Sequence, residues 1–150
     1  MSATLTNQAS PPVPVPEANI GYLFRLAHQS FRALLEDELR DLSLSAQEYA
    51  ILSVFETRPE LSTSELARIT QVTRQTMHAA ILKLETTGLL ERKAQNQRVV
   101  LVAPTKRGRR TLEAATGRVR EVERAAFAGL SDDSERAVRA WLANLAAMHP

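Results

Sequence analysis

Three closely spaced helix starts in the middle of the chain constrain the fold more than any other feature of this sequence. Ser45 and Ser62 each precede a glutamate by three residues, the pattern of a capping box in which side chain and backbone satisfy each other's hydrogen bonds. Thr73 can cap a further helix after the short turn Gln71-Val72. Short helices joined by so tight a turn predict a helix-turn-helix at residues 62–87.

The segments on either side of this motif predict long helices and one hairpin. Apolar residues recur every three or four positions over residues 17–42 and 106–148, as in amphipathic helices. Residues 89–92 and 98–102 have the pattern of two short strands around a polar turn. We therefore expect a mainly α chain with a small β-hairpin, in which a winged helix-turn-helix at about 45–105 is flanked by the long helices.

The first 16 residues differ from the rest of the chain. They contain four prolines and no charged side chain, and proline removes backbone donors and restricts the residue before it. We expect residues 1–16 to form a disordered arm and residues 17–150 to form one domain. The apolar stripes of the outer helices exceed what a monomer of this size needs, which favours a homodimer built through those helices.

The composition excludes several classes of function. The absence of cysteine excludes disulfides, thiolate metal sites and a cysteine nucleophile. Neither a membrane-spanning apolar run nor a signal peptide is present, so we expect a cytoplasmic protein with no membrane partner. The sequence has no phosphate-binding glycine loop, metal motif or nucleophile constellation, and we expect no cofactor, no metal and no enzymatic activity.

Charge is concentrated in the middle of the chain. Residues 61–110 carry 10 basic and 3 acidic side chains, a net charge of +7, against −4 for residues 1–60 and −1 for residues 111–150. A basic segment between mildly acidic flanks is typical of a protein that neutralises phosphates. It predicts binding to double-stranded DNA, and a solvated basic surface with no partner is the alternative on charge alone.

The helix after Thr73 is the candidate recognition helix. A helical wheel places Met77, Ala80, Ile81 and Leu84 on its core side and polar residues on the outer side. Arginine suits guanine and glutamine suits adenine, so Arg74 and Gln75 are the best candidates for base contacts. The predicted DNA-contacting set, with phosphate and wing contacts included, is Ser62, Ser64, Thr73, Arg74, Gln75, Thr76, His78, Lys83, Arg92, Lys93 and Arg98. A winged helix used for protein association, without specific DNA binding, is the alternative, and it predicts an apolar or acidic outer face.

In combination, these motifs resemble the MarR (multiple antibiotic resistance regulator) family of transcriptional regulators. The resemblance covers about residues 18–148 and is carried by Leu66-Ala67-Arg68, by the segments 73–78 and 84–92, and by the segment 98–108. It implies a homodimer that represses transcription at a pseudo-palindromic operator, with recognition helices one turn of DNA, roughly 34 Å, apart. It also implies release of DNA when a small aromatic or phenolic ligand binds.

Two further expectations follow from the resemblance. Tyr22, His28 and Tyr49 lie on helices that should border the ligand cleft, although ordinary core or boundary positions are the alternative. The family usually has an aspartate two residues before the wing arginine, and this chain has Asn96 two residues before Arg98. Because a neutral amide cannot make the same ion pair, we expect a wing that is less rigid or differently aimed.

Overall fold

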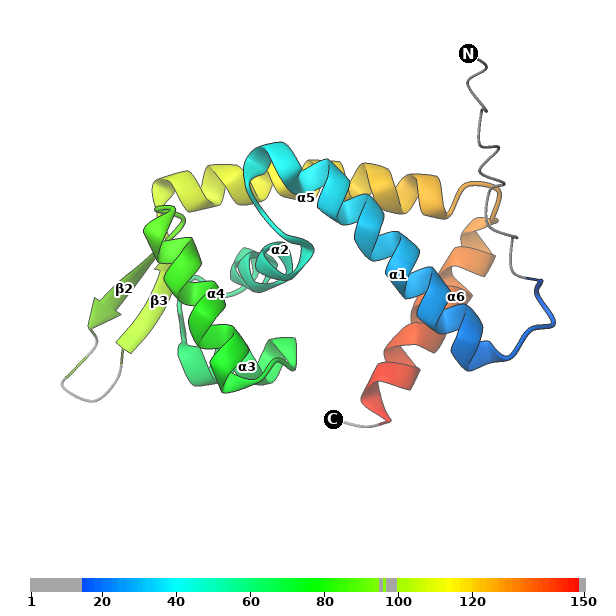
Figure 1. Ribbon diagram of the computed structural model, residues 1–150, viewed down its shortest axis with the longest axis horizontal. Helices are drawn as coiled ribbons and strands as arrows, with labels where there is room; N and C mark the ends of the chain where they lie inside the picture. Colours follow the sequence, from blue (N-terminus) through cyan, green and yellow to red (C-terminus); the bar gives the residue numbers. More distant parts are fainter. Residues whose placement is uncertain (1–14, 95, 97–99, 149–150) are drawn as a thin grey trace, which may run out of the picture. The chain divides into compact units, whose positions relative to one another are not determined.

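The computed structural model describes residues 15–94, 96 and 100–148 of the chain, which forms two compact units, 1–33 and 34–150 (Figure 1). The predicted helix at 17–42 consists of α1 (Ile20–Leu39) and a single 3-10 turn, η1 (Arg40–Leu42). The side chain of Asn19 accepts a hydrogen bond from the Gly21 N–H at 3.0 Å, and α1 therefore begins three residues later than predicted. Of the predicted arm, residues 1–14 lie outside the described residues.

The second unit has the predicted order of helices and strands. α2 and a 3-10 turn precede the helix-turn-helix. A hairpin comes after it, and two long helices follow the hairpin, as labelled in Figure 1. The bounds are α2 (Ala46–Ser53), η2 (Val54–Glu56), β1 (Leu61–Ser62), α3 (Thr63–Thr70), α4 (Arg74–Thr86), β2 (Leu90–Ala94), β3 (Val100–Pro104), α5 (Lys106–Ala126) and α6 (Asp132–Ala147).

The three predicted helix starts are confirmed. Ser45 and Ser62 each form a complete capping box with the glutamate three residues later. The Thr73 hydroxyl accepts a hydrogen bond from the Thr76 N–H at 3.1 Å. Between α3 and α4, Gln71 adopts a left-handed conformation with φ of 54°, which ends α3 and reverses the chain within three residues.

The sheet has one strand more than the sequence predicts. β1 pairs antiparallel with β3, which in turn pairs with β2, so that the strand order is β1-β3-β2. β1 contains only Leu61 and Ser62, too few residues for an alternating pattern to reveal. β2 begins at Leu90, one residue later than expected, and residues 98–99 of the predicted return strand lie outside the described residues.

The hydrophobic core fixes which face of α4 is exposed. Met77, Ala80, Ile81 and Leu84 are all buried, as the helical wheel predicts. They share one core cluster with residues of α2, α3 and β3 and with Leu112, Ala115 and Val119 of α5. Because these four residues anchor the inner side of α4, its outer side is held toward the solvent.

In contrast to α4, the last helix has no buried residue in the single chain. The large apolar residues of α6 and of its C-cap are 37 to 79% exposed, and they are Val138, Trp141, Leu142, Leu145 and Met148. Among the described residues, no helix combines the length and the apolar character that crossing a membrane requires. The described residues also contain no cluster of histidine and carboxylate side chains that could hold a metal ion.

Candidate nucleic-acid interface

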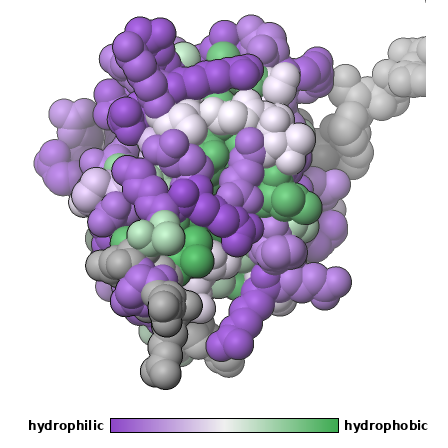
Figure 2. All heavy atoms as spheres, turned by 90° about the vertical axis from the view of Figure 1, so that its left-hand side faces the viewer, coloured by the Kyte–Doolittle hydropathy of each residue, from purple (hydrophilic) through white to green (hydrophobic). Residues whose placement is uncertain are grey.

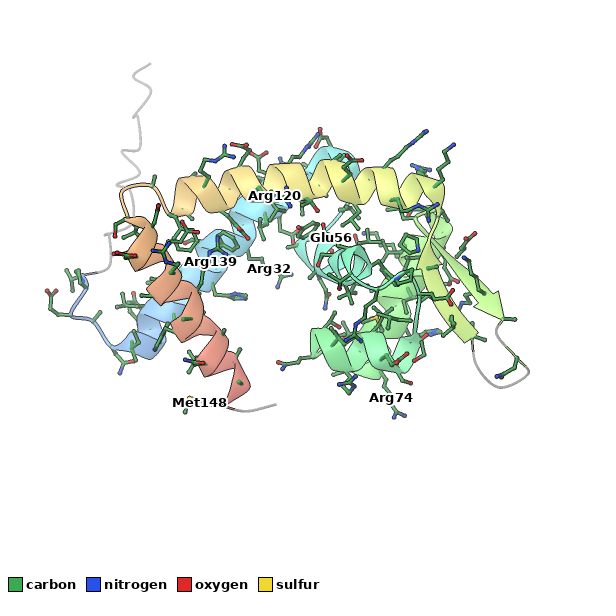
Figure 3. The ribbon with its side chains drawn as sticks, turned by 180° about the vertical axis from the view of Figure 1, so that it is seen from behind. Arg32, Glu56, Arg74, Arg120, Arg139 and Met148 are labelled. Carbon is green, nitrogen blue, oxygen red and sulfur yellow. The ribbon has the colours of Figure 1, made fainter. Side chains whose placement is uncertain are left out.

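The N-terminal half of α4 presents polar side chains to the solvent. Arg74 and Gln75, the first two residues of the helix, are exposed, and His78 is exposed one turn later. Figure 3 shows the side chain of Arg74 pointing outward from the start of α4. Thr76 is half-buried and accepts a hydrogen bond from the Thr73 hydroxyl at 2.9 Å. Arg74, Gln75 and His78 are therefore the exposed polar side chains in the first half of α4.

A second arginine, Arg68, which sequence reasoning did not select, accompanies Arg74. The two lie across the turn between α3 and α4 and line a groove of about 430 Å³ with Ser64, Glu65, Ala67 and Val72. Within the described part of the chain, neither guanidinium has a carboxylate at ion-pair distance. Its position in the sequence could have indicated this arginine, because Arg68 lies in the last turn of α3, directly before the turn that leads to α4.

The predicted phosphate contact at Ser62 has another hydrogen-bond partner. Its N–H and its hydroxyl donate to the same Glu65 carboxylate oxygen, Oε2, at 3.0 and 2.7 Å. The hydrogen bond from the Ser62 hydroxyl is the main cause of the lowered pKa of Glu65, and the hydrogen bond from the Ser62 N–H is the second cause. A carboxylate thus already occupies the N-terminus of α3, where a phosphate would bind. Ser64, also predicted, is exposed in the first turn.

Lys83 pairs with a carboxylate of a different helix. Its ammonium lies 2.7 Å from Oε1 of Glu48, whose side chain is only 8% exposed. A groove of about 430 Å³ runs beside this pair, lined by Gln47, Glu48, Gln75, Thr76, Ala79, Ala80 and Lys83. Lys83, which the sequence predicts as a DNA contact, therefore pairs across the space between α2 and α4.

The hairpin is tied to α4 by a second ion pair. Arg92 donates from Nε and Nη2 to the two carboxylate oxygens of Glu85, at 2.6 and 3.1 Å. These hydrogen bonds raise the pKa of Arg92. Lys93 stays half-exposed, with its ammonium 4.0 Å from Glu91. Asn96 is exposed, and the predicted contact at Arg98 lies outside the described residues.

Hydrophilic side chains cover most of the hairpin end of the molecule, as Figure 2 shows. Two large apolar residues are exceptions: Leu82 of α4 is 54% exposed and Val100 of β3 is 43% exposed. The surface formed by α4 and the hairpin is therefore polar with isolated apolar positions, the composition that a DNA groove and its phosphates require.

The three predicted ligand-binding residues are divided between the two units. Tyr22 and His28 are exposed on the part of α1 that belongs to residues 1–33, where the Arg25 guanidinium lies 5.4 Å from the Tyr22 ring centre. Tyr49 belongs to the second unit and is half-buried. Its hydroxyl lies 3.5 Å from the hydroxyl of Thr116 on α5. Tyr49 therefore joins α2 to α5.

Comparison with known proteins agrees with this geometry. The sequence profile of the MarR family matches residues 42–98. The HTH-type transcriptional repressor Rv2887 of Mycobacterium tuberculosis is 30% identical over 131 residues, which cover 86% of this chain and 94% of the repressor.

Two solved structures extend the similarity to most of the fold. A probable transcriptional regulator from Pseudomonas aeruginosa has a TM-score of 0.79 and 29% identity, covering 85% of this chain and 97% of that one. The Mycobacterium tuberculosis MarR family protein Rv2887 in complex with salicylic acid has a TM-score of 0.68 and 30% identity, covering 87% and 98%. The similarity therefore includes the outer helices as well as the helix-turn-helix.

Proposed function

Because the chain belongs to the MarR family of transcriptional regulators, we propose that it is a homodimeric repressor that binds a pseudo-palindromic operator. The outer face of α4 carries this proposal, since it exposes Arg74, Gln75 and His78 on a helix anchored by a buried inner face. A protein-association module would present an apolar or acidic face there, and Leu82 is the single large apolar residue exposed on α4. The polar face favours DNA.

The exposed stripe of α6 supports the dimer. Val138, Trp141, Leu142 and Leu145 recur at three- and four-residue intervals and are each 37 to 46% exposed in the single chain. A second copy would remove this apolar surface from water, at roughly 25 cal/mol per Å². A two-fold dimer would place the recognition helices on successive turns of the major groove, roughly 34 Å apart.

The effector proposal is based on a relative. Rv2887 has been solved with salicylic acid and with p-aminosalicylic acid, and we extend that ligand class, small aromatic acids, to this chain. Tyr22, His28 and Tyr49 are the proposed contacts. The relatives are transcriptional regulators, and we propose a regulatory rather than catalytic role for this chain, in the cytoplasm.

Fluorescence anisotropy with labelled duplexes tests the proposal. The wild type should bind the promoter region of its own gene more tightly than random DNA, with an affinity that falls steeply with added salt. Arg74→Ala should weaken specific binding by about 1–3 kcal/mol and random binding much less. Arg136→Ala, which alters an exposed arginine on α6, is the control and should leave both unchanged.

Three results would each contradict one part of this proposal. Affinity that is independent of salt contradicts phosphate binding. Equal loss on specific and random DNA makes Arg74 a phosphate contact and not a base contact. Millimolar salicylate that leaves the DNA complex intact contradicts the proposed effector class while leaving the operator proposal in place.

A further inference from the structure

Glu48 is the one charged side chain that is buried among the residues the structure describes. Both of its carboxylate oxygens have partners. Oε2 accepts the Ser45 N–H at 2.9 Å, which completes the capping box of α2, and Oε1 lies 2.7 Å from the Lys83 ammonium. A buried carboxylate is costly unless it is paired. Lys83, a residue of the recognition helix, is therefore the cation that pairs with this buried carboxylate.

The ion pair adjoins the part of α4 that carries the base-contacting candidates. Gln75 and Lys83 line the same groove as Glu48, and at 1.5 Å per residue they lie roughly 12 Å apart along the helix axis. Over that length, a tilt of about 10° moves the side chain of Gln75 by roughly 2 Å. That displacement exceeds the tolerance of a bidentate hydrogen bond to a base.

We propose that Glu48 and Lys83 are positioning residues for base recognition: their ion pair ties α2 to α4 and sets the orientation of Arg74 and Gln75. Lys83 is then no phosphate contact, although its side chain is 55% exposed. The proposal rests on the DNA-binding function proposed above. It adds that Lys83 contributes to the specificity of DNA binding and does not contribute to the salt dependence of binding.

The test compares two DNA probes. One is a duplex that the wild-type protein selects from a random-sequence library, and the other is poly(dI-dC). The variants are Lys83→Met, Lys83→Arg, Glu48→Gln and the double variant Glu48→Gln/Lys83→Met. Lys93→Met is the matched control, since Lys93 is 52% exposed on the hairpin and has no buried carboxylate as its partner.

If Glu48 and Lys83 position α4, variants that break their ion pair should lose specificity, and the salt slope of their DNA binding should stay unchanged. Lys83→Met and Glu48→Gln should each weaken binding to the selected duplex by roughly tenfold and leave poly(dI-dC) binding and its salt slope unchanged. Lys83→Arg, which can still reach Glu48, should restore most of the loss. The double variant should lose less than the product of the single losses, because both changes remove one interaction. Lys93→Met should reduce the slope by about 0.9, as for a lost phosphate contact.

A phosphate contact at Lys83 gives the opposite pattern and would overturn the proposal. Lys83→Met would then weaken both probes equally and reduce the slope by about 0.9, and Glu48→Gln would strengthen binding by releasing the cation. Wild-type binding by all four variants would also overturn it. Circular dichroism establishes that each variant is folded, and Glu48→Gln, for which the two readings predict opposite changes, decides the test if Lys83→Met does not fold. A wild-type protein that selects no duplex contradicts the proposed function itself.

Discussion

Replacing Gly108 by alanine should destabilise the protein, although alanine is the better helix former. In the first turn of α5, Gly108 faces the backbone of Leu89, and an added Cβ would lie 1.9 Å from the Leu89 carbonyl oxygen. Ordinary contact begins at 3.4 Å, so one element must move by roughly 1.5 Å. That movement would strain the hydrogen bond from the Thr105 N–H to the same oxygen, now 3.0 Å long.

Two opposing effects determine the size of the change. Glycine to alanine inside a helix contributes about 1 kcal/mol of stability, whereas overpacking a fitted contact costs about 1–3 kcal/mol or more. Since the obstacle is a backbone atom and not a flexible side chain, we expect the upper end of that range. The net loss should be about 2 kcal/mol, or a fall in Tm of roughly 4–8 °C.

Gly117 of the same helix provides the matched control. It is exposed, and a Cβ there would meet no atom within 4 Å, so Gly117→Ala should gain about 1 kcal/mol from helix propensity alone. Urea unfolding at one fixed protein concentration measures both variants without interference from dimerisation. A Gly108→Ala protein as stable as Gly117→Ala would refute the close approach of α5 to Leu89.

Three further changes have expected outcomes. Hydrogen bonds from Ser62 hold the pKa of Glu65 below its ordinary value, so the stability they give is present above about pH 4.3 and is lost as pH falls through the folded-state pKa. Glu65→Gln should therefore lose less unfolding free energy between pH 6 and pH 3 than the wild type, as measured by urea titration. Arg92→Met should cost about 1 kcal/mol, since it breaks the bidentate pair with Glu85, and should leave the salt slope of DNA binding unchanged. Leu145→Asp, on the exposed stripe of α6, should give monomers by light scattering at micromolar concentration, and a persistent dimer would place the interface elsewhere.

Features encoded within a few residues were predictable from the sequence. The capping boxes at Ser45 and Ser62 and the cap at Thr73 each involve residues no more than three apart, so spacing alone identifies them. The buried side of α4 followed from helical periodicity in the same way. In contrast, β1 is held by pairing with residues 101–102, about 40 positions later, and no local pattern encodes such a pairing.

Ion-pair partners were not predictable for the same reason. The sequence predicts Lys83 and Arg92 as DNA contacts because they are basic and lie on the recognition helix or just after it. In the folded chain, Lys83 meets Glu48, 35 positions earlier, and Arg92 meets Glu85. The sequence reveals the number of cations, but the fold determines which of them a carboxylate already neutralises.

This distinction changes what the basic segment implies for DNA affinity. Four of its cations, Lys106, Arg107, Arg109 and Arg110, begin α5, next to Gly88, whose carbonyl accepts the Thr105 hydroxyl at 2.6 Å. α4 has 13 residues, so this cluster lies roughly 18 Å along the helix from Arg74. With Lys83 and Arg92 closely paired, the other described cations of the helix-turn-helix and hairpin are Arg68, Arg74 and Lys93, and Lys93 lies 4.0 Å from Glu91.

Because each phosphate contact releases counterions from the DNA, the number of contacting cations determines how steeply affinity falls with salt. Ten phosphate contacts per protomer would give a salt slope of about −9, whereas three give about −2.7. Contacts from residues outside the described part, Arg98 among them, would add to the smaller value. Specificity in this protein must then depend less on the number of cations than on how firmly α4 is held. The residues that hold it are the buried side chains beneath α4, the Glu48–Lys83 pair and the Glu85–Arg92 pair.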